Sequence, residues 1–175
     1  MFNFSQGKSS TNVPRQSASD GLIALDTPVE FDAGLVSRLV AEHRELDARF
    51  NGLLGELESD PLAERSVRAC STKLHDLRRT EALWLYPLIA RGIARDPVAR
   101  RQFLQLRLVM LGLARRVLRA FDELSHAVRR GTHTKSSADE VARALAEYRQ
   151  RNEGEIYPLY QLMGTSRRAD GIRVA

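Results

Sequence analysis

The chain is poor in three features on which many folds and sites depend: cysteine, aromatic side chains and long apolar runs. Its 175 residues include one cysteine, Cys70, which excludes an internal disulfide and argues against a zinc site built from cysteines. No apolar run approaches the roughly 20 residues of a membrane-spanning helix, and the first residues lack the charged-then-apolar pattern of a leader. We therefore expect a cytoplasmic protein.

Several catalytic signatures are missing as well. The sequence contains no P-loop, no glycine-rich dinucleotide loop and no order of Ser, His and Asp that is typical of hydrolases. It also has no recognised DNA-binding motif and, with 6% aromatic residues, no set of rings on which bases could stack. We expect a protein that is not an enzyme and that binds neither nucleic acid nor membranes.

What the sequence has in abundance is leucine, alanine and arginine, which favour helix, within an ordinary hydrophobic fraction of 43%. Cap residues followed by proline mark three helix starts, and a capping box at Ser137 marks a fourth. The helices predicted from these signals span about 28–58, 61–92, 97–130 and 138–163, with Asp32 as a rival start for the first.

The short connections between these helices predict an all-α, up-down-up-down four-helix bundle. Residues 27–164 form this bundle in our interpretation. Residues 1–26, rich in Ser, Asn, Gln and Gly, are interpreted as a flexible arm, and residues 165–175 as a flexible basic tail. Oligomeric state stays open.

Each predicted helix carries an apolar seam at alternating spacings of three and four. The seam of the second helix includes Cys70 and Trp84, and that of the fourth ends on Leu159 and Leu162. Polar residues interrupt three seams near mid-helix, namely His43, Glu81, Tyr148, Asn152 and Glu155. A carboxylate on a buried seam needs a donor or a cation, so we expect Glu81 and His43 to meet in a polar cluster inside the bundle.

A short phrase occurs twice and carries a family resemblance. Residues 85–89 and 156–160 share an apolar-Tyr-Pro-Leu core, each after a long helical stretch with a glutamate shortly upstream. With the Glu-His-x-x-Leu pattern at residues 42–46, these stretches resemble the hemerythrin-like (HHE cation-binding) family over about residues 28–163. The resemblance implies a four-helix bundle that holds two irons between histidines and carboxylates.

Carried over to this chain, the ligand pattern is largely lost. His43 holds the ligand position of the first helix, and Glu81, six residues before Pro87, holds the acid of the second. The other ligand positions of the family are occupied by Leu77, Met110, Tyr148 and Asn152. The resemblance therefore implies a degenerate metal site.

Two interpretations of His43 and Glu81 stay open. In the first, they form a buried hydrogen-bonded pair, extended by Tyr148 and Asn152, and the protein has no cofactor. In the second, they bind one non-haem metal with Tyr148, Asn152 or Glu155 as additional ligands, and the protein is an oxygen or redox sensor or carrier. Iron or manganese suits such ligands best, and zinc is an alternative. His75, His126 and His133 lie off the seams and are not expected to bind metal.

Arginine is dense along the third predicted helix, which has few acidic residues, in a chain of formal net charge +5. A solvated face is one interpretation. The other is a docking surface for an acidic protein or an anionic ligand. On this basis the sequence predicts a regulatory or adaptor protein whose candidate partner-binding residues are Arg107, Arg115, Arg116 and Arg119.

Overall fold

A computed structural model describes residues 30–55, 57 and 63–171, and it is helical almost throughout. Two short π-helical turns, η1 (Glu81–Leu85) and η2 (Asn152–Ile156), interrupt two of the long helices. The α-helices are α1 (Leu35–Leu54), α2 (Ala63–Thr80), α3 (Tyr86–Gly92), α4 (Pro97–Arg130), α5 (Thr134–Arg151) and α6 (Tyr157–Gly171).

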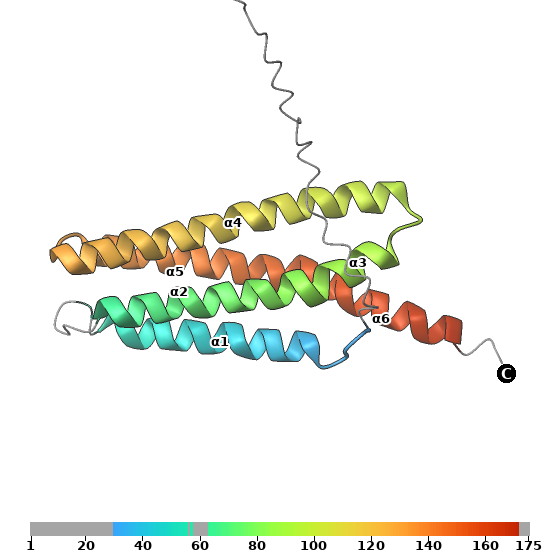
Figure 1. The fold of residues 1–175 in the computed structure, drawn as a ribbon, viewed down its shortest axis with the longest axis horizontal. Helices are drawn as coiled ribbons and strands as arrows, with labels where there is room; N and C mark the ends of the chain where they lie inside the picture. The colour runs from blue at the N-terminus through green and yellow to red at the C-terminus, as the bar shows by residue number, and fades with distance from the viewer. Residues whose placement is uncertain (1–29, 56, 58–62, 172–175) are drawn as a thin grey trace, which may run out of the picture.

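These elements form four packed rods, which confirms the predicted four-helix bundle (Figure 1). The rods are α1, α2–η1–α3, α4 and α5–η2–α6. Both α1 and α4 pack against α2 and α5, which places α1 and α4 at opposite corners of the bundle. No helix of the described ranges is long and apolar enough to cross a membrane.

The π-helical turns lie directly before the two prolines of the repeated phrase. Because proline has no N–H and its ring crowds the preceding turn, an uninterrupted α-helix is strained at Pro87 and Pro158. In each π turn the N–H of the preceding tyrosine instead bonds five residues back, from Tyr86 to the Glu81 carbonyl and from Tyr157 to the Asn152 carbonyl. The repeat thus marks a structural irregularity that the helical periodicity did not predict.

The extra residue in each π turn changes which side chains face the core. After Glu81 the next buried residue is Leu85, whereas Trp84 is 51% exposed. After Asn152 the buried residue is Ile156, and Leu162 is 55% exposed. The predicted placement of Trp84 and Leu162 on the seams was therefore wrong, because the prediction assumed a constant α-helical period through both turns.

Helix α4 has the bounds that its sequence signals predicted. The Asp96 side chain caps it by accepting hydrogen bonds from the N–H groups of Val98 (2.9 Å) and Ala99 (3.0 Å), and Pro97 occupies the first turn. Gly131 ends it in the left-handed conformation, with φ 65°.

Other predicted boundaries differ from the structure. The first helix starts at Leu35 rather than at about residue 28, because residues 30–34 are not helical. Asp32, the rival start, accepts a hydrogen bond from Gly34 N–H just before the helix, whereas residues 27–28 lie outside the described residues. Helix α5 starts at Thr134, four residues before the predicted start. The connection from α4 is short because both Gly131 and His133 (φ 55°) adopt the left-handed conformation, which reverses the chain within a few residues. Helix α6 continues to Gly171, past the predicted end of the bundle at residue 164.

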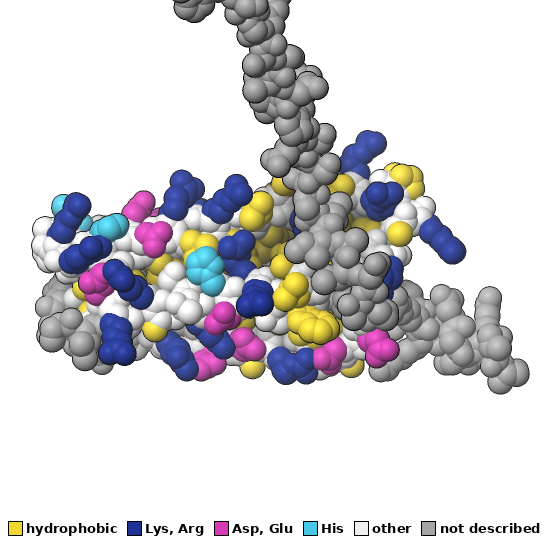
Figure 2. Space-filling model, viewed as in Figure 1, with side chains coloured by type: hydrophobic (Ala, Val, Ile, Leu, Met, Phe, Trp, Pro, Cys, Tyr) yellow, Lys and Arg dark blue, Asp and Glu magenta, His cyan; other side chains and the backbone are white. Residues whose placement is uncertain are grey.

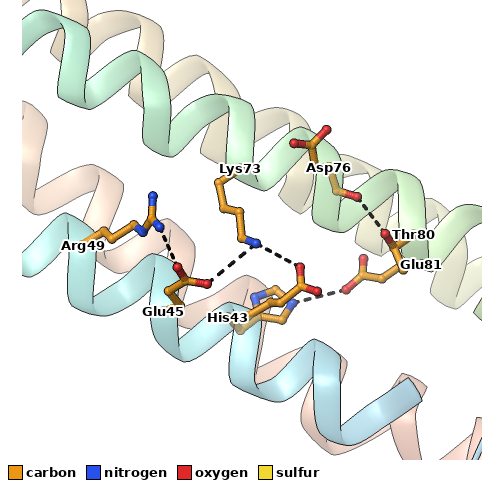
Figure 3. Close-up of polar contacts among 8 residues, drawn as sticks. His43, Glu45, Arg49, Lys73, Asp76, Thr80 and Glu81 are labelled. Atoms are coloured by element: carbon orange, nitrogen blue, oxygen red, sulfur yellow. Dashed lines mark hydrogen bonds and ion pairs between the residues drawn. The ribbon is translucent and has the colours of Figure 1, made fainter. Parts of the chain in front are cut away.

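Ion pairs link neighbouring rods outside the core. Lys73 of α2 reaches Glu42 (3.2 Å) and Glu45 (3.8 Å) of α1, as Figure 3 shows for its contacts with that helix. Arg149 of α5 pairs with Asp47 of α1. Most of the core is apolar, with an edge-to-face pair of Phe50 and Phe121 and a buried Cys70, as expected for a core thiol. Burial raises the pKa of the Cys70 thiol.

The chain just before α1 is fastened to α6. The Phe31 ring stacks on Tyr160 with centroids 5.0 Å apart, and the Asp32 N–H donates to the Tyr160 hydroxyl at 3.0 Å. A Cβ at Gly164 would lie 2.1 Å from the Phe31 ring, so only glycine leaves room for this contact. The segment entering α1 is therefore held at the end of the bundle where α6 and α3 meet.

Replacing Gly164 with alanine tests this attachment. We expect the variant to lose about 1–3 kcal/mol of unfolding free energy in urea titrations, since Phe31 must leave its place on Tyr160. The matched control is Gly112→Ala on α4, where a Cβ meets nothing within 4 Å. Equal stability of the two variants would show that Phe31 contributes nothing to the fold.

Candidate functional site

The predicted polar cluster forms around the Glu81 carboxylate. His43 Nε2 of α1 lies 3.2 Å from Glu81 Oε1, and Figure 3 shows the two side chains pointing toward each other across the bundle. The Tyr148 hydroxyl of α5 donates to Glu81 Oε2 at 2.5 Å, and the Tyr157 hydroxyl donates to Oε1 at 3.1 Å. All four side chains are at most 3% exposed.

This arrangement satisfies the carboxylate without an ion. Oε2 accepts a hydrogen bond from Tyr148 and Oε1 accepts one from Tyr157, and His43 Nε2 lies within hydrogen-bond distance of Oε1, to which it donates in the Nε2-protonated tautomer. Two phenols and an imidazole thus replace the water that Glu81 loses on burial. The result is a fully engaged carboxylate that joins three of the four rods.

Asn152 is buried at the same turn, next to Tyr148. It is 0% exposed, and neither its Oδ1 nor its Nδ2 has a hydrogen-bond partner among the described residues. Asn152 begins η2 as Glu81 begins η1, so the second copy of the repeat has an amide at the position where the first copy has a carboxylate. A buried amide without partners is destabilising, which makes Asn152 the weak point of the cluster.

Glu155, the remaining candidate, does not reach the cluster. Its side chain is 39% exposed and pairs with Arg151 on the surface of the same rod. The register change at η2 turns it away from the core, where Ile156 takes its place. It is therefore not positioned to supply a second carboxylate to a site at His43 and Glu81.

Tyr157 is the residue of the cluster that the sequence analysis missed. The assumed period placed it beside the seam, but the π turn rotates it inward onto Glu81. A signal was present, because Tyr157 and Tyr86 hold the same position in the repeated phrase. The ring of Tyr86 instead packs edge-on against Phe103 and lies beneath the Arg107 guanidinium.

The tyrosine hydroxyls are strongly biased toward the protonated form. Burial, reinforced by the negative charge of Glu81, raises the pKa of Tyr148 and of Tyr157 well above the ordinary value. Burial also raises the pKa of Tyr86 and of Tyr160. These four are all the tyrosines of the chain.

We therefore expect no tyrosine of the native protein to ionise near pH 10, as exposed phenols do. Because each folded-state pKa lies above the unfolded one, stability is complete below about pH 10 and falls as the pH rises further. Absorbance at 295 nm should increase in one cooperative step together with unfolding. A gradual increase near pH 10, with far-ultraviolet circular dichroism unchanged, would contradict the buried network.

The residues present do not fit the two-metal site that the family resemblance implies. Leu77 and Met110 offer no oxygen or nitrogen, and Tyr148 and Asn152 stand where a histidine and an acid are needed. No three His, Cys, Asp or Glu side chains in the described ranges are grouped to hold a metal ion. His43 and Glu81 remain as a pair, already engaged with each other and with two phenols.

The other histidines lie away from this pair. His75 and His126 line a groove of about 360 Å³ between α2 and α4, together with Arg68, Asp122 and Arg129. Both arginines approach Glu64, and Arg129 also contacts His126 Nδ1 at 2.7 Å. The charges in this groove are balanced by one another. His133 lies in the turn before α5.

The four candidate arginines divide into two kinds. Arg116 donates to Glu140 at 2.8 Å and to Glu147 at 2.9 Å, and so ties α4 to α5. Arg107 lies over the Tyr86 ring, 5.2 Å from its centroid. Arg115 and Arg119 are exposed and make no ion pair within the described part of the chain. Only these last two are open to a partner.

Exposed leucines lie in line with these two arginines. Leu104, Leu108 and Leu111 are 51%, 61% and 36% exposed and recur at spacings of four and three. Helical geometry places them on one face, turned away from the core face that contains Phe103 and Met110. We call this row the α4 strip; in order it comprises Arg101, Leu104, Leu108, Leu111, Arg115 and Arg119.

The α4 strip is free of acidic residues. No Asp or Glu occurs between Asp96 and Asp122, so no carboxylate of α4 lies among the strip residues. Figure 2 shows basic side chains along the upper edge of the molecule over α4, with apolar side chains exposed among them. Three large apolar side chains exposed in one row between arginines make the α4 strip a candidate interaction surface.

Comparisons of the chain with family models, with curated proteins and with solved structures found no match.

Proposed function

We propose that the chain is a non-enzymatic regulatory or adaptor protein that binds an acidic, partly apolar protein partner on the α4 strip. The exposed leucine row carries this proposal. Leu104, Leu108 and Leu111 expose 51%, 61% and 36% of their surface on the side of α4 opposite the core. Burial of these leucines against a partner would remove their exposed apolar surface from water.

The charges define what such a partner presents. Arg101 lies before the leucines and Arg115 and Arg119 after them, so carboxylates at both ends of an apolar segment would be complementary. Arg107 and Arg116 contribute to the fold in this account, through Tyr86 and through Glu140 and Glu147. The proposed docking surface is thus narrower and more apolar than the set of four arginines predicted from the sequence.

We further propose that the scaffold is hemerythrin-like and that its polar cluster now acts as a structural network. In support, His43 and Glu81, which hold two ligand positions of that family, lie within hydrogen-bond distance of each other inside the bundle. The hydrogen bonds from Tyr148 and Tyr157 use the lone pairs that a metal would need. Such a network specifies how the rods align, as polar residues do in coiled coils.

Charge reversal on the strip tests the proposed function. The double variant Arg115→Glu, Arg119→Glu should lose the partners that the wild-type protein captures from lysate, measured by quantitative mass spectrometry. The control, Arg44→Glu with Arg79→Glu, makes the same change in net charge at exposed positions of α1 and α2. Equal recovery with both variants would exclude the α4 strip as the docking surface.

A further inference from the structure

The groove of about 360 Å³ between α2 and α4 presents the same three kinds of hydrogen-bond donor on both of its walls. It has the size of a small-molecule site, and Figure 2 shows histidine side chains exposed among charged ones on the face that these two helices form. The donors are Arg68, Ser71 and His75 of α2 and Ser125, His126 and Arg129 of α4. An anion between the walls would accept hydrogen bonds from both helices.

A carboxylate oxygen beside the groove already shows that the two walls converge on a negative charge. Oε1 of Glu64 lies 2.7 Å from Arg68 Nη2 on its own helix. From α4, Arg129 Nε lies 3.7 Å and the Ser125 hydroxyl 3.4 Å from the same oxygen. Ser125 is 7% exposed, so its hydroxyl is fixed in the wall. A guanidinium carries more N–H groups than these contacts use, so both arginines keep donors for a second anion.

The contact between Arg129 and His126 determines which ring nitrogen of the histidine carries the proton. Arg129 Nη2 lies 2.7 Å from His126 Nδ1, and a guanidinium can only donate, so Nδ1 accepts and the neutral ring is protonated on Nε2. A second proton would therefore go to Nδ1 and bring two cations into contact. A doubly charged anion that accepts from both groups relieves this repulsion, so proton uptake and anion binding favour each other.

The charges around the groove define its ligand. They belong to Glu64, Arg68 and His75 on α2 and to Asp122, His126 and Arg129 on α4. With neutral imidazoles the two arginines are matched by the two carboxylates, and each protonated imidazole adds one positive charge. We propose that this groove binds a tetrahedral oxyanion, a phosphate or sulfate group, together with protons on His75 and His126. Donors on two facing walls suit a group whose several acceptor oxygens point in different directions.

This site is separate from the α4 strip, because no residue of the strip lines the groove. Its ligand is accordingly a small anion rather than the protein partner proposed for the strip. Either assignment can fail without the other.

Titration of the full-length protein with sulfate, followed by the ¹⁵N amide shifts of Ser71 and Ser125, tests the site. Sulfate remains a dianion throughout the range in which histidines titrate, about pH 5 to 8. We expect saturable shifts and at least about fivefold tighter binding near pH 6 than near pH 8, since the protonated groove carries more positive charge. Near pH 8, phosphate and phenyl phosphate are both largely dianions, and the tighter of the two shows whether a free ion or a monoester is the better ligand.

Matched variants complete the test. Arg129→Gln should weaken sulfate binding near pH 6 by at least about tenfold. Arg130→Gln removes the same charge from an exposed neighbour outside the groove and should change the affinity less than about twofold. His75→Gln combined with His126→Gln, which cannot take up protons, should bind sulfate equally at the two pH values. Shifts that never saturate would overturn the proposal, as would equal losses in the two arginine variants or a pH dependence that survives in the double histidine variant.

Discussion

Replacing Glu81 with alanine is expected to lower the unfolding free energy by about 3–5 kcal/mol. The substitution leaves the hydroxyls of Tyr148 and Tyr157 and the His43 N–H buried without an acceptor, and it opens a cavity between the rods. Urea titration followed by circular dichroism at neutral pH measures the loss. A change below about 1 kcal/mol would show that the network does not support the fold.

Two further variants test whether the stability loss comes from the hydrogen-bond network or would follow the removal of any acidic side chain. Glu45→Ala removes an acid of α1 that is 46% exposed, and we expect a change within about 0.5 kcal/mol. Replacing all four members together, with Leu at His43 and Glu81 and Phe at Tyr148 and Tyr157, should recover most of the loss. Buried polar groups cost most when one partner is removed and least when all become apolar.

Replacing Leu108 with glutamate should weaken binding of a captured partner by about 30-fold or more. Leu108 is 61% exposed at the centre of the α4 strip, so the fold tolerates the change, whereas a docked partner would bury an unpaired carboxylate. Titration calorimetry or biolayer interferometry with the purified partner measures the effect.

The matched control is Gln102→Glu, which alters the net charge equally on the same helix but off the strip. It should change affinity less than about threefold, since charges outside a docking surface act mainly through long-range attraction. Comparable losses in both variants would indicate that α4 acts through its overall charge, and the leucine row would have no special role.

Much of the fold could be predicted from local signals. Asp96–Pro97 and Gly131 define α4 because a cap, a proline and a left-handed glycine each have a direct structural cause. His43, Glu81 and Tyr148 were identified because polar side chains on apolar seams need partners, and the structure brings them together.

The side chains after the two π turns could not be placed from the sequence, because the prediction assumed a constant helical period. The π turns shift the register by one residue, which exposes Trp84, buries Leu85 and turns Tyr157 onto Glu81. The α4 strip was not predicted either. Helix α4 has leucines on more than one face, so composition alone does not say which row lies against its neighbours and which faces solvent.

The most direct test of the central claim is site-specific photo-cross-linking at position 108. The full-length protein, made in its own cells with a photoreactive phenylalanine at Leu108, should give a discrete adduct with a partner whose contact peptide contains aliphatic and acidic residues. The same probe at Gln102 should give little or none. Equal labelling at the two positions, or adducts at Gln102 alone, would contradict the α4 strip as the surface through which this protein works.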